Sequence, residues 1–239
     1  MGELHQGDDQ EDPRAAELEE FMAVAAHDLR NPIAVVRASA QMAQRQMARG
    51  DPDGAQGRLK AIVEQTDRLT EMLETFLDAA RVTTGRLVLR PEQVELRDVV
   101  DSAADRARIL VSEHRERMLD CRVPEGCVGA WDKAKLGRAV RALVCNALVY
   151  GDPAAPVRVD ARRSDGRVRM TVSGGGAGPE SEEAGHLFEL FYRGPSAAEA
   201  GQSGSGLGLY TARGIARSHG GEVRWVEGDR FEIELPLIE

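Results

Sequence analysis

The chain has 239 residues, of which 42% are hydrophobic, so it is long and apolar enough for one large domain or two small ones. Cys121, Cys127 and Cys145 are an odd set without a C-x-x-C pair, which disfavours a disulfide scaffold or a zinc ribbon and favours a reducing, cytoplasmic setting. A net charge of −9 argues against a general nucleic-acid binder, and no apolar run is long enough to predict insertion into a membrane.

Acidic residues are concentrated at the start of the chain. Residues 1–20 hold eight acids and one base, Arg14, so this segment carries most of the net charge. Such a surplus of like charge favours a solvated segment over a packed one. We therefore expect residues 1–14 to form an acidic, flexible lead-in, with a docking role as the alternative.

Residues 15–84 are predicted to form a hairpin of two long helices. Two stretches place apolar or small residues at alternating intervals of three and four, and the turn signal Gly50–Gly54 separates them. The first stretch has Met22, Ala25, Leu29, Pro32, Val36, Ser39 and Ala43 at these positions, and the second has Leu59, Ile62, Thr66, Leu69, Leu73, Phe76 and Ala80. Because a lone hairpin leaves part of such a seam exposed, we expect a dimeric four-helix bundle.

Residues 85–239 are predicted to form an α+β domain, because short β-type runs alternate with helical stretches. We expect strands at Arg86–Arg90, Met118–Val123, Val157–Arg163, Arg167–Ser173, Glu222–Val226 and Phe231–Leu235, and helices at 97–113, 132–149 and 206–218. The last two strands are expected to form a hairpin around Glu227–Asp229. The loop at 174–206 is long enough to indicate a functional role.

His27 is the first candidate for chemistry. When the first helix turns its apolar seam toward partner helices, His27 falls at the heptad position that points away from them, into solvent. The adjacent Asp28 could polarise or deprotonate the imidazole, which makes a ring nitrogen a better nucleophile. Asn31 lies one turn further along the same face, and Pro32 removes a helical hydrogen bond from the carbonyl of Asp28. The plain alternative is a surface histidine beside a harmless kink.

Two glycine-rich loops and one asparagine are further candidates. Gly204–Leu209 opens the helix expected at 206–218, where backbone N–H groups favour phosphate oxygens. Gly174–Gly178 exposes backbone directly after a predicted strand. Asn146 could offer its side-chain carbonyl to a divalent cation. A plainer interpretation stays open for each: a hinge for the loops, and a cap or surface amide for Asn146.

Taken in order, these features resemble the catalytic core of two-component sensor histidine kinases over nearly all of the chain after residue 15. Phe21–Pro32, F-M-A-V-A-A-H-D-L-R-N-P, is similar to the family's phospho-acceptor box and is the most specific motif. Further segments resemble the asparagine box (Asp132, Leu136, Asn146, Ala147, Tyr150), the phenylalanine box (Leu187–Gly194), the glycine box (Gly204–Leu209) and the segment before the final hairpin (His219–Gly221).

The resemblance implies a dimerising helical hairpin followed by an α/β-sandwich domain of the GHKL or Bergerat type that binds ATP and Mg²⁺. His27 would receive the γ-phosphoryl group, with Asp28 as general base, and pass it to an aspartate of a response regulator. Asn31 would position water when phosphate is removed from that regulator, and Asn146 would bind Mg²⁺. The nucleotide-binding residues implied are Asn146, Tyr150, Gly174, Gly176, Gly178, Arg193, Gly204, Ser205, Gly206, Leu207 and Gly208.

The sequence departs from the family pattern at three positions. Gly174 stands where the family has the aspartate that hydrogen-bonds the adenine amino group. Val149 stands where a basic residue often reaches the phosphates, and Ala142 replaces the first asparagine of its box. Losing one hydrogen bond to a charged group costs about 1.5–3 kcal/mol, or about 10- to 100-fold in affinity. We therefore expect weakened ATP binding, which Gly174→Asp should strengthen.

Three functions remain open on the sequence. The first is a dimeric, cytoplasmic histidine kinase that autophosphorylates His27 and receives its signal either from an upstream sensor protein or from sequence missing from this chain. The second is a degenerate kinase that binds ATP weakly and acts as a phosphotransfer relay or a response-regulator phosphatase. The third is a dimerisation module that regulates another kinase. In the first two, the response regulator is expected to dock on the exposed helix face around Arg37, Gln41 and Arg45.

Overall fold

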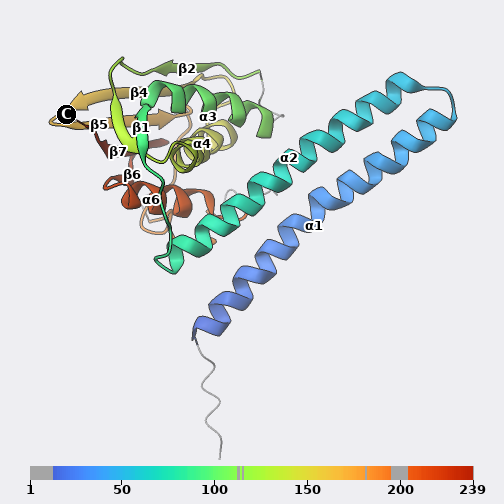
Figure 1. Cartoon of the computed structure of the whole chain (residues 1–239), viewed down its shortest axis with the longest axis horizontal. Coiled ribbons are helices and arrows are strands. Elements are labelled where there is room, and N and C mark those ends of the chain that lie inside the picture. Colours follow the sequence, from blue (N-terminus) through green and yellow to red (C-terminus); the bar gives the residue numbers. More distant parts are fainter. Residues whose placement is uncertain (1–12, 112–113, 115, 181, 195–203, 239) are drawn as a thin grey trace, which may run out of the picture.

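The computed structural model describes residues 13–111, 114, 116–180, 182–194 and 204–238. Most of the predicted acidic lead-in, residues 1–12, lies outside the described residues. The described chain forms a long helical hairpin followed by an α/β domain (Figure 1). This order confirms the predicted fold class, whereas the association of two hairpins into one bundle stays a prediction.

The hairpin consists of α1 (Pro13–Ala48) and α2 (Pro52–Thr83), which pack against each other along their length. The turn between them is short because Asp51, three residues after α1 ends, already caps the start of α2. The Asp51 carboxylate accepts a hydrogen bond of 2.9 Å from the Gly54 N–H, and a proline occupies the first helical position. Pro32 is buried and causes no break in α1.

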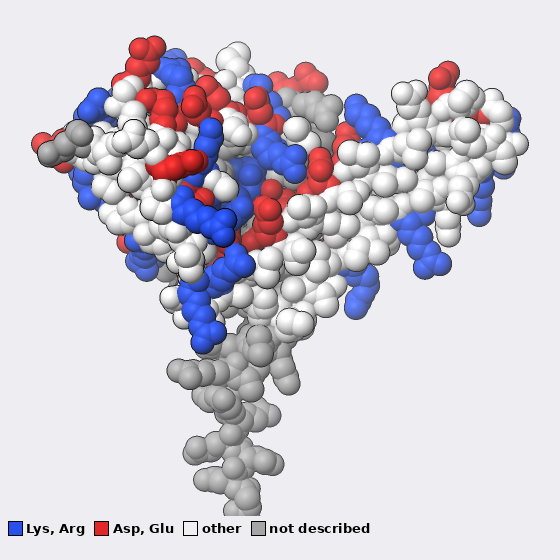
Figure 2. Space-filling model, in the orientation of Figure 1, with Lys and Arg blue, Asp and Glu red and all other residues white. Residues whose placement is uncertain are grey.

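Much apolar surface of the hairpin stays exposed in the single chain. Among the predicted seam residues, Ala43 and Phe76 are buried, whereas Met22 and Leu73 are more than half exposed. Other exposed large hydrophobic side chains on the two helices are Ile33, Val35, Met42, Met47, Leu59, Val63 and Leu77. Much of the hairpin surface visible in Figure 2 is accordingly uncharged. An apolar helix face of this kind normally packs against another surface.

The α/β domain is built on a five-stranded sheet with the order β2-β4-β5-β7-β6. The strands are β2 (Leu119–Arg122), β4 (Val157–Ser164), β5 (Arg167–Ser173), β6 (Glu222–Glu227) and β7 (Arg230–Pro236). β2 runs parallel to β4, and all other neighbours are antiparallel. The predicted final hairpin is confirmed as the β6–β7 pair.

Three helices cover the face of the sheet that is turned toward the hairpin (Figure 1): α3 (Leu96–Leu110), α4 (Lys133–Tyr150) and α6 (Gly208–Ser218). Strand residues alternate between the two faces, so that Val168 and Met170 are buried while Arg169 is exposed. Sheet and helices share one core, to which α4 contributes Leu143 and α6 contributes Ile215. This two-layer frame positions the loops described below.

The strand predicted at Arg86–Arg90 is not formed. Instead, β1 (Glu92–Glu95) pairs antiparallel with β3 (Val128–Trp131), and the sequence pattern predicts neither. Residues 86–90 have no partner strand within the described ranges, and Val88 is 75% exposed. β3 contains glycine and alanine, which have low strand propensity, so pairing with β1 is what makes it a strand. The helices expected in this domain are present, with ends shifted by at most three residues.

No helix among the described residues is long and apolar enough to cross a membrane.

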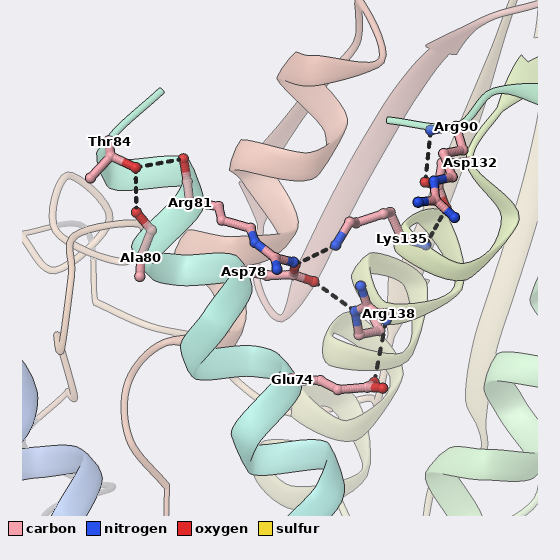
Figure 3. Close-up of polar contacts among 9 residues, drawn as sticks. All are labelled: Glu74, Asp78, Ala80, Arg81, Thr84, Arg90, Asp132, Lys135 and Arg138. Carbon is pink, nitrogen blue, oxygen red and sulfur yellow. Dashed lines mark hydrogen bonds and ion pairs between the residues drawn. The ribbon is translucent and has the colours of Figure 1, made fainter. Parts of the chain in front are cut away.

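His219 ties the end of α6 to the start of α4. Its Nε2 accepts a hydrogen bond of 2.9 Å from the Asp132 N–H, and its Nδ1–H donates to the Ile215 carbonyl at 2.8 Å. Burial lowers the pKa of His219, so the imidazole stays neutral. Burial would raise the pKa of Asp132, but hydrogen bonds from the N–H groups of Lys135 and Arg90 outweigh it and lower this pKa (Figure 3).

Candidate active site

A cavity of about 980 Å³ lies where the helical hairpin meets the α/β domain. Its walls come from α1, α2, α4, the segment between β5 and α6, the start of α6 and the β6–β7 hairpin. His27 and Asn146 are far apart in the sequence, yet both line this cavity. The tertiary structure therefore brings the two predicted centres of chemistry together within one chain.

His27 has 82% of its side chain exposed, in agreement with its heptad position. Its Nδ1 lies 3.1 Å from Oδ1 of Asp28. A carboxylate oxygen accepts in this contact, so Nδ1 carries the proton and Nε2 keeps its lone pair. Oδ2 of Asp28 is buried and has no hydrogen-bond partner among the described residues. Asn31, one turn further on, also lines the cavity.

Polar and titratable side chains of α4 and of the segment before α6 border the cavity. Asn146, Tyr150 and Cys145 come from α4, and Arg193 precedes α6. Burial raises the pKa of Tyr150, an effect that the charge of Arg193 opposes. Burial also raises the pKa of Cys145 to about 11, so this thiol is protonated near neutral pH and is a poor nucleophile. The chemistry of the site therefore rests on His27 rather than on a thiolate.

The predicted phosphate loop reaches the cavity at the start of α6. Gly204, Ser205, Gly206 and Gly208 line it, and Gly208 is the first helical residue. Gly206 has a φ of +70°, and a Cβ at this position would lie 2.5 Å from the carbonyl carbon of Phe191. Glycine is therefore required here both by its backbone conformation and by the close approach of a second chain segment.

Leu207 is predicted to bind the nucleotide, but its side chain does not line the cavity. It is fully buried against Phe76 and Ala79 of α2. Phe21, the first residue of the phospho-acceptor box, belongs to the same cluster, and its ring lies 6.0 Å from Phe76 and 5.7 Å from Phe191. This apolar cluster holds the segment before α6 against both helices of the hairpin.

The loop after β5 meets the cavity through only part of its length. Gly178 lines the cavity, whereas Gly174 and Gly176, also predicted to bind the nucleotide, do not. Gly174 is buried, and a Cβ at this position would lie 2.3 Å from the Ala147 carbonyl oxygen and 3.0 Å from Cα of Gly151. The loop therefore packs directly on the end of α4.

Asp229 is a site residue that the sequence pattern does not identify. Its Oδ2 accepts hydrogen bonds from the N–H groups of Gly174, at 2.5 Å, and Gly176, at 3.0 Å. Asp229 also lines the cavity. In the sequence it is one polar residue of a predicted turn, and nothing in that pattern points to a loop 55 residues away.

Arg117 is the second residue that sequence reasoning misses. Its side chain is buried, and its guanidinium donates five hydrogen bonds of 2.7–3.3 Å. The acceptors are the carbonyl oxygens of Ala147, Leu148, Ala155 and Gly174. Burial lowers the pKa of Arg117, but an arginine remains charged. This side chain therefore ties the end of α4 to the loop after β5.

A charge network joins α2 to α4 (Figure 3). Asp78 is 1% exposed and accepts hydrogen bonds from Nζ of Lys135, at 2.5 Å, and from Nε of Arg138, at 2.7 Å. Two further ion pairs between these helices are Glu74–Arg138 and Glu71–Arg141. The acids share one face of α2 and the bases one face of α4, since their spacing is three or four residues. That spacing is the only signal in the sequence, and it does not identify the partner helix.

Comparison with known proteins assigns both parts of the chain. Residues 17–85 match the family described as His Kinase A (phospho-acceptor) domain, and residues 131–239 match the Histidine kinase-, DNA gyrase B-, and HSP90-like ATPase family. The chain belongs to the two-component sensor histidine kinases. The first match contains His27 and the second contains Asn146, so the predicted family is confirmed.

Relatives in this kinase family include the sensor-like histidine kinase SenX3 of Mycolicibacterium smegmatis, which is 25% identical over 91% of this chain. The probable sensor histidine kinase TcrY of Mycobacterium tuberculosis is 28% identical over 92% of this chain. The matches cover 57% and 46% of these two relatives, so the chain spans about half of their length.

Solved structures of sensor kinases share the fold. The mycobacterial sensor histidine kinase MprB has a TM-score of 0.52 and 26% identity, and the match covers 62% of this chain and 97% of that one. The Acinetobacter baumannii histidine kinase AdeS has a TM-score of 0.57, and the match covers 89% of this chain and 98% of that one. Its sequence identity is 19%, so this match supports the fold alone.

Gly174→Asp is expected to weaken the binding of ADP by at least about tenfold, which reverses the expectation from the sequence. The side chain has no room beside the Ala147 carbonyl, and its carboxylate would lie next to that of Asp229. Calorimetric titration with ADP measures the change. Gly57→Asp, where a Cβ meets nothing within 4 Å, adds the same charge on α2 and should bind ADP as the unmodified protein does. Tighter binding by Gly174→Asp would contradict this packing.

Proposed function

We propose that the chain is the catalytic core of a histidine kinase, which transfers the γ-phosphoryl group of Mg-ATP to His27 and then to an aspartate of a response regulator. The observation that carries the proposal is the single cavity lined by His27, Asn146 and the segment Gly204–Gly208. Phosphoryl transfer depends chiefly on positioning and on stabilisation of charge. A cavity that holds the acceptor and the nucleotide-binding elements together supplies the first of these.

His27 is the nucleophile in this proposal. Because its Nδ1–H donates to Asp28, the lone pair on Nε2 is free to attack the γ-phosphorus. The N–P bond forms while the bond from phosphorus to the bridging oxygen breaks, and ADP leaves with that electron pair. Asp28 takes the Nδ1 proton as positive charge develops on the ring. The exposure of His27 then allows the aspartate of a regulator to reach the phosphoryl group.

The α/β domain holds the nucleotide. α6 begins at Gly208 without a side-chain cap, and backbone N–H groups at the start of a helix favour phosphate oxygens. Asn146 fits a magnesium ion, because its amide lines the cavity and makes no hydrogen bond with the described residues. Mg²⁺ commonly combines one or two protein ligands with phosphates and water, and when bound it neutralises phosphate charge.

Two copies of the chain form the dimer through their hairpins. The exposed apolar side chains of α1 and α2, among them Met22, Leu59 and Leu73, support pairing into a four-helix bundle. The response regulator docks beside His27 on the exposed face with Arg37, and an upstream sensor protein supplies the signal. Free cysteines among the described residues fit a cytoplasmic setting.

The test is incubation of the purified chain with Mg²⁺ and γ-labelled ATP. We expect acid-labile, alkali-stable label on the unmodified chain and none on His27→Ala, because only the imidazole forms this N–P bond. His114→Ala removes an imidazole that does not line the cavity, so it should be labelled normally. Label that persists on His27→Ala would contradict the assignment of the nucleophile.

The same experiment distinguishes the proposed kinase from the alternative, a phosphotransfer relay. A kinase is labelled by ATP without a regulator, whereas a relay receives label only from a phosphorylated regulator. Absence of label together with absence of nucleotide binding would overturn the proposed kinase activity.

A further inference from the structure

A carboxylate from the last hairpin lines the cavity beside the loop that follows β5. Asp229 lies in the turn between β6 and β7, lines the cavity and is half-buried. Both of its hydrogen bonds, to the N–H groups of Gly174 and Gly176, use Oδ2. Oδ1 makes no hydrogen bond within the described residues, so it remains available to a donor in the cavity.

The charge of Asp229 disfavours contact with the phosphates. The phosphoryl group to be transferred must reach His27, so the phosphates lie between α1 and the start of α6. A carboxylate placed beside them would repel them, whereas a carboxylate at the nucleoside end can accept a hydrogen bond. Asp229 adjoins the loop after β5, and Gly178 of that loop packs on the Gly228 carbonyl of the same hairpin.

The hydrogen-bond partners of Asp229 indicate which part of the nucleotide it meets, namely the base. Gly174 occupies the position where the family pattern has an aspartate for the adenine amino group. Gly174 itself has no side chain to offer, and a side chain there would collide with the Ala147 carbonyl. The Gly174 N–H instead holds Oδ2 of Asp229 at 2.5 Å. The chain therefore has a carboxylate next to residue 174, but it belongs to the turn between β6 and β7 rather than to residue 174 itself.

A hydrogen bond and a ring contact hold the hairpin that carries Asp229 in position. The indole N–H of Trp225 donates to the Gly228 carbonyl at 2.7 Å. Phe231 is buried and its ring meets that of Phe188 edge to face, with 6.2 Å between the ring centres. A carboxylate fixed on both sides in this way loses little conformational freedom on binding a ligand, which favours recognition.

We propose that Asp229 recognises the 6-amino group of adenine, in place of the carboxylate missing at Gly174. Oδ2 keeps the loop in position, and Oδ1 accepts the hydrogen bond from the base. This assignment rests on the proposed binding of ATP and specifies which residue selects the base. It also means that the absence of an acid at Gly174 is compensated within the same pocket.

The test compares ADP with purine riboside diphosphate, which lacks the 6-amino group, by calorimetric titration in the presence of Mg²⁺. We expect the unmodified chain to prefer ADP by about 10- to 100-fold, the value of one hydrogen bond to a charged group. Asp229→Asn keeps an oxygen for the two glycine N–H groups but turns an NH₂ toward the base, so the preference should fall to near one. Glu227→Gln removes a charge from the same hairpin outside the cavity and should keep the preference.

Equal weakening of both nucleotides by Asp229→Asn would overturn the assignment, because it would show that the carboxylate only supports the loop. Equal binding of both nucleotides by the unmodified chain would also overturn it, while leaving the proposed function intact. Binding of neither nucleotide would overturn the assignment and the proposed function together.

Discussion

Asp78→Ala is expected to lower the free energy of unfolding by about 3–5 kcal/mol, because it leaves the charge of Lys135 unpaired and Arg138 with only its Glu74 pair in the junction between α2 and α4. Asp78 is 1% exposed, so water does not replace the lost carboxylate without a rearrangement of the junction. Urea unfolding measures the loss, and hydrogen exchange of α2 amides shows whether it arises at the junction.

Asp67→Ala is the matched control for Asp78→Ala. Asp67 also lies on α2 and pairs with the α/β domain, through Arg106 at 3.6 Å, but both side chains are more than one-third exposed. Water screens such a pair, so this change should cost less than about 1 kcal/mol. Equal small losses for the two variants would show that the buried pairs of Asp78 do not stabilise the junction.

The charge network also bears on the proposed reaction. Arg138 and Arg141 line the cavity, and carboxylates of α2 hold both guanidinium groups. α1 packs against α2, so the position of His27 relative to the nucleotide depends on how α2 sits on α4. A variant that loosens the junction should therefore reduce labelling of His27 as well as stability.

Arg117→Met is expected to lower the free energy of unfolding by about 3–5 kcal/mol and to weaken ADP binding by at least about tenfold. Each buried carbonyl that is left without a donor costs about 1–3 kcal/mol, and this applies to the carbonyls of Leu148 and Gly174. The Ala147 carbonyl keeps its hydrogen bond from the Gly151 N–H, and the contacts of the Ala155 carbonyl are only partly buried. The loop after β5 would then no longer be held against the end of α4. Urea unfolding and calorimetric titration with ADP measure the two effects.

Arg117→Lys should recover only part of the loss, because an ammonium group cannot reproduce the planar fork of the guanidinium. Arg122→Met is the control. Arg122 lies on β2, is 69% exposed and pairs with Asp120, so water screens this pair and the variant should unfold at nearly the same urea concentration as the unmodified protein. Full recovery with Arg117→Lys would show that charge alone, rather than the geometry of the five hydrogen bonds, holds the loop.

Much of the fold follows from local patterns. The helical period of the seam predicts α1 and α2, and the glycine and aspartate residues between them predict the turn, because periodicity and capping act over a few residues. The same holds for β4 to β7, where strands alternate clearly and hairpin turns are short. The local rule fails for β1 and β3. These strands are four residues long, and only their pairing across the chain stabilises them.

The candidate site, like the fold, could be predicted from the sequence only in part. The residue types at His27, Asp28 and Asn146 indicate acceptor and ligand chemistry from the sequence alone, and the structure places all three on one cavity. Leu207 belongs to a motif associated with nucleotide binding, yet its side chain serves packing. Motif membership therefore predicts which segment borders the site, but it does not predict which side chains of that segment face the ligand.

The sequence by itself determined the two-part architecture of this protein, the exposed histidine and the glycine-rich start of α6, because each depends on neighbours within a few residues. Only the tertiary structure decided which carboxylate lies beside Gly174, where the family pattern has an acid and this chain has none. The contacts of Asp229 and Arg117 with this glycine span 55 and 57 residues. No periodicity, cap or turn rule reaches over such separations, since they are closed by the packing of the whole domain.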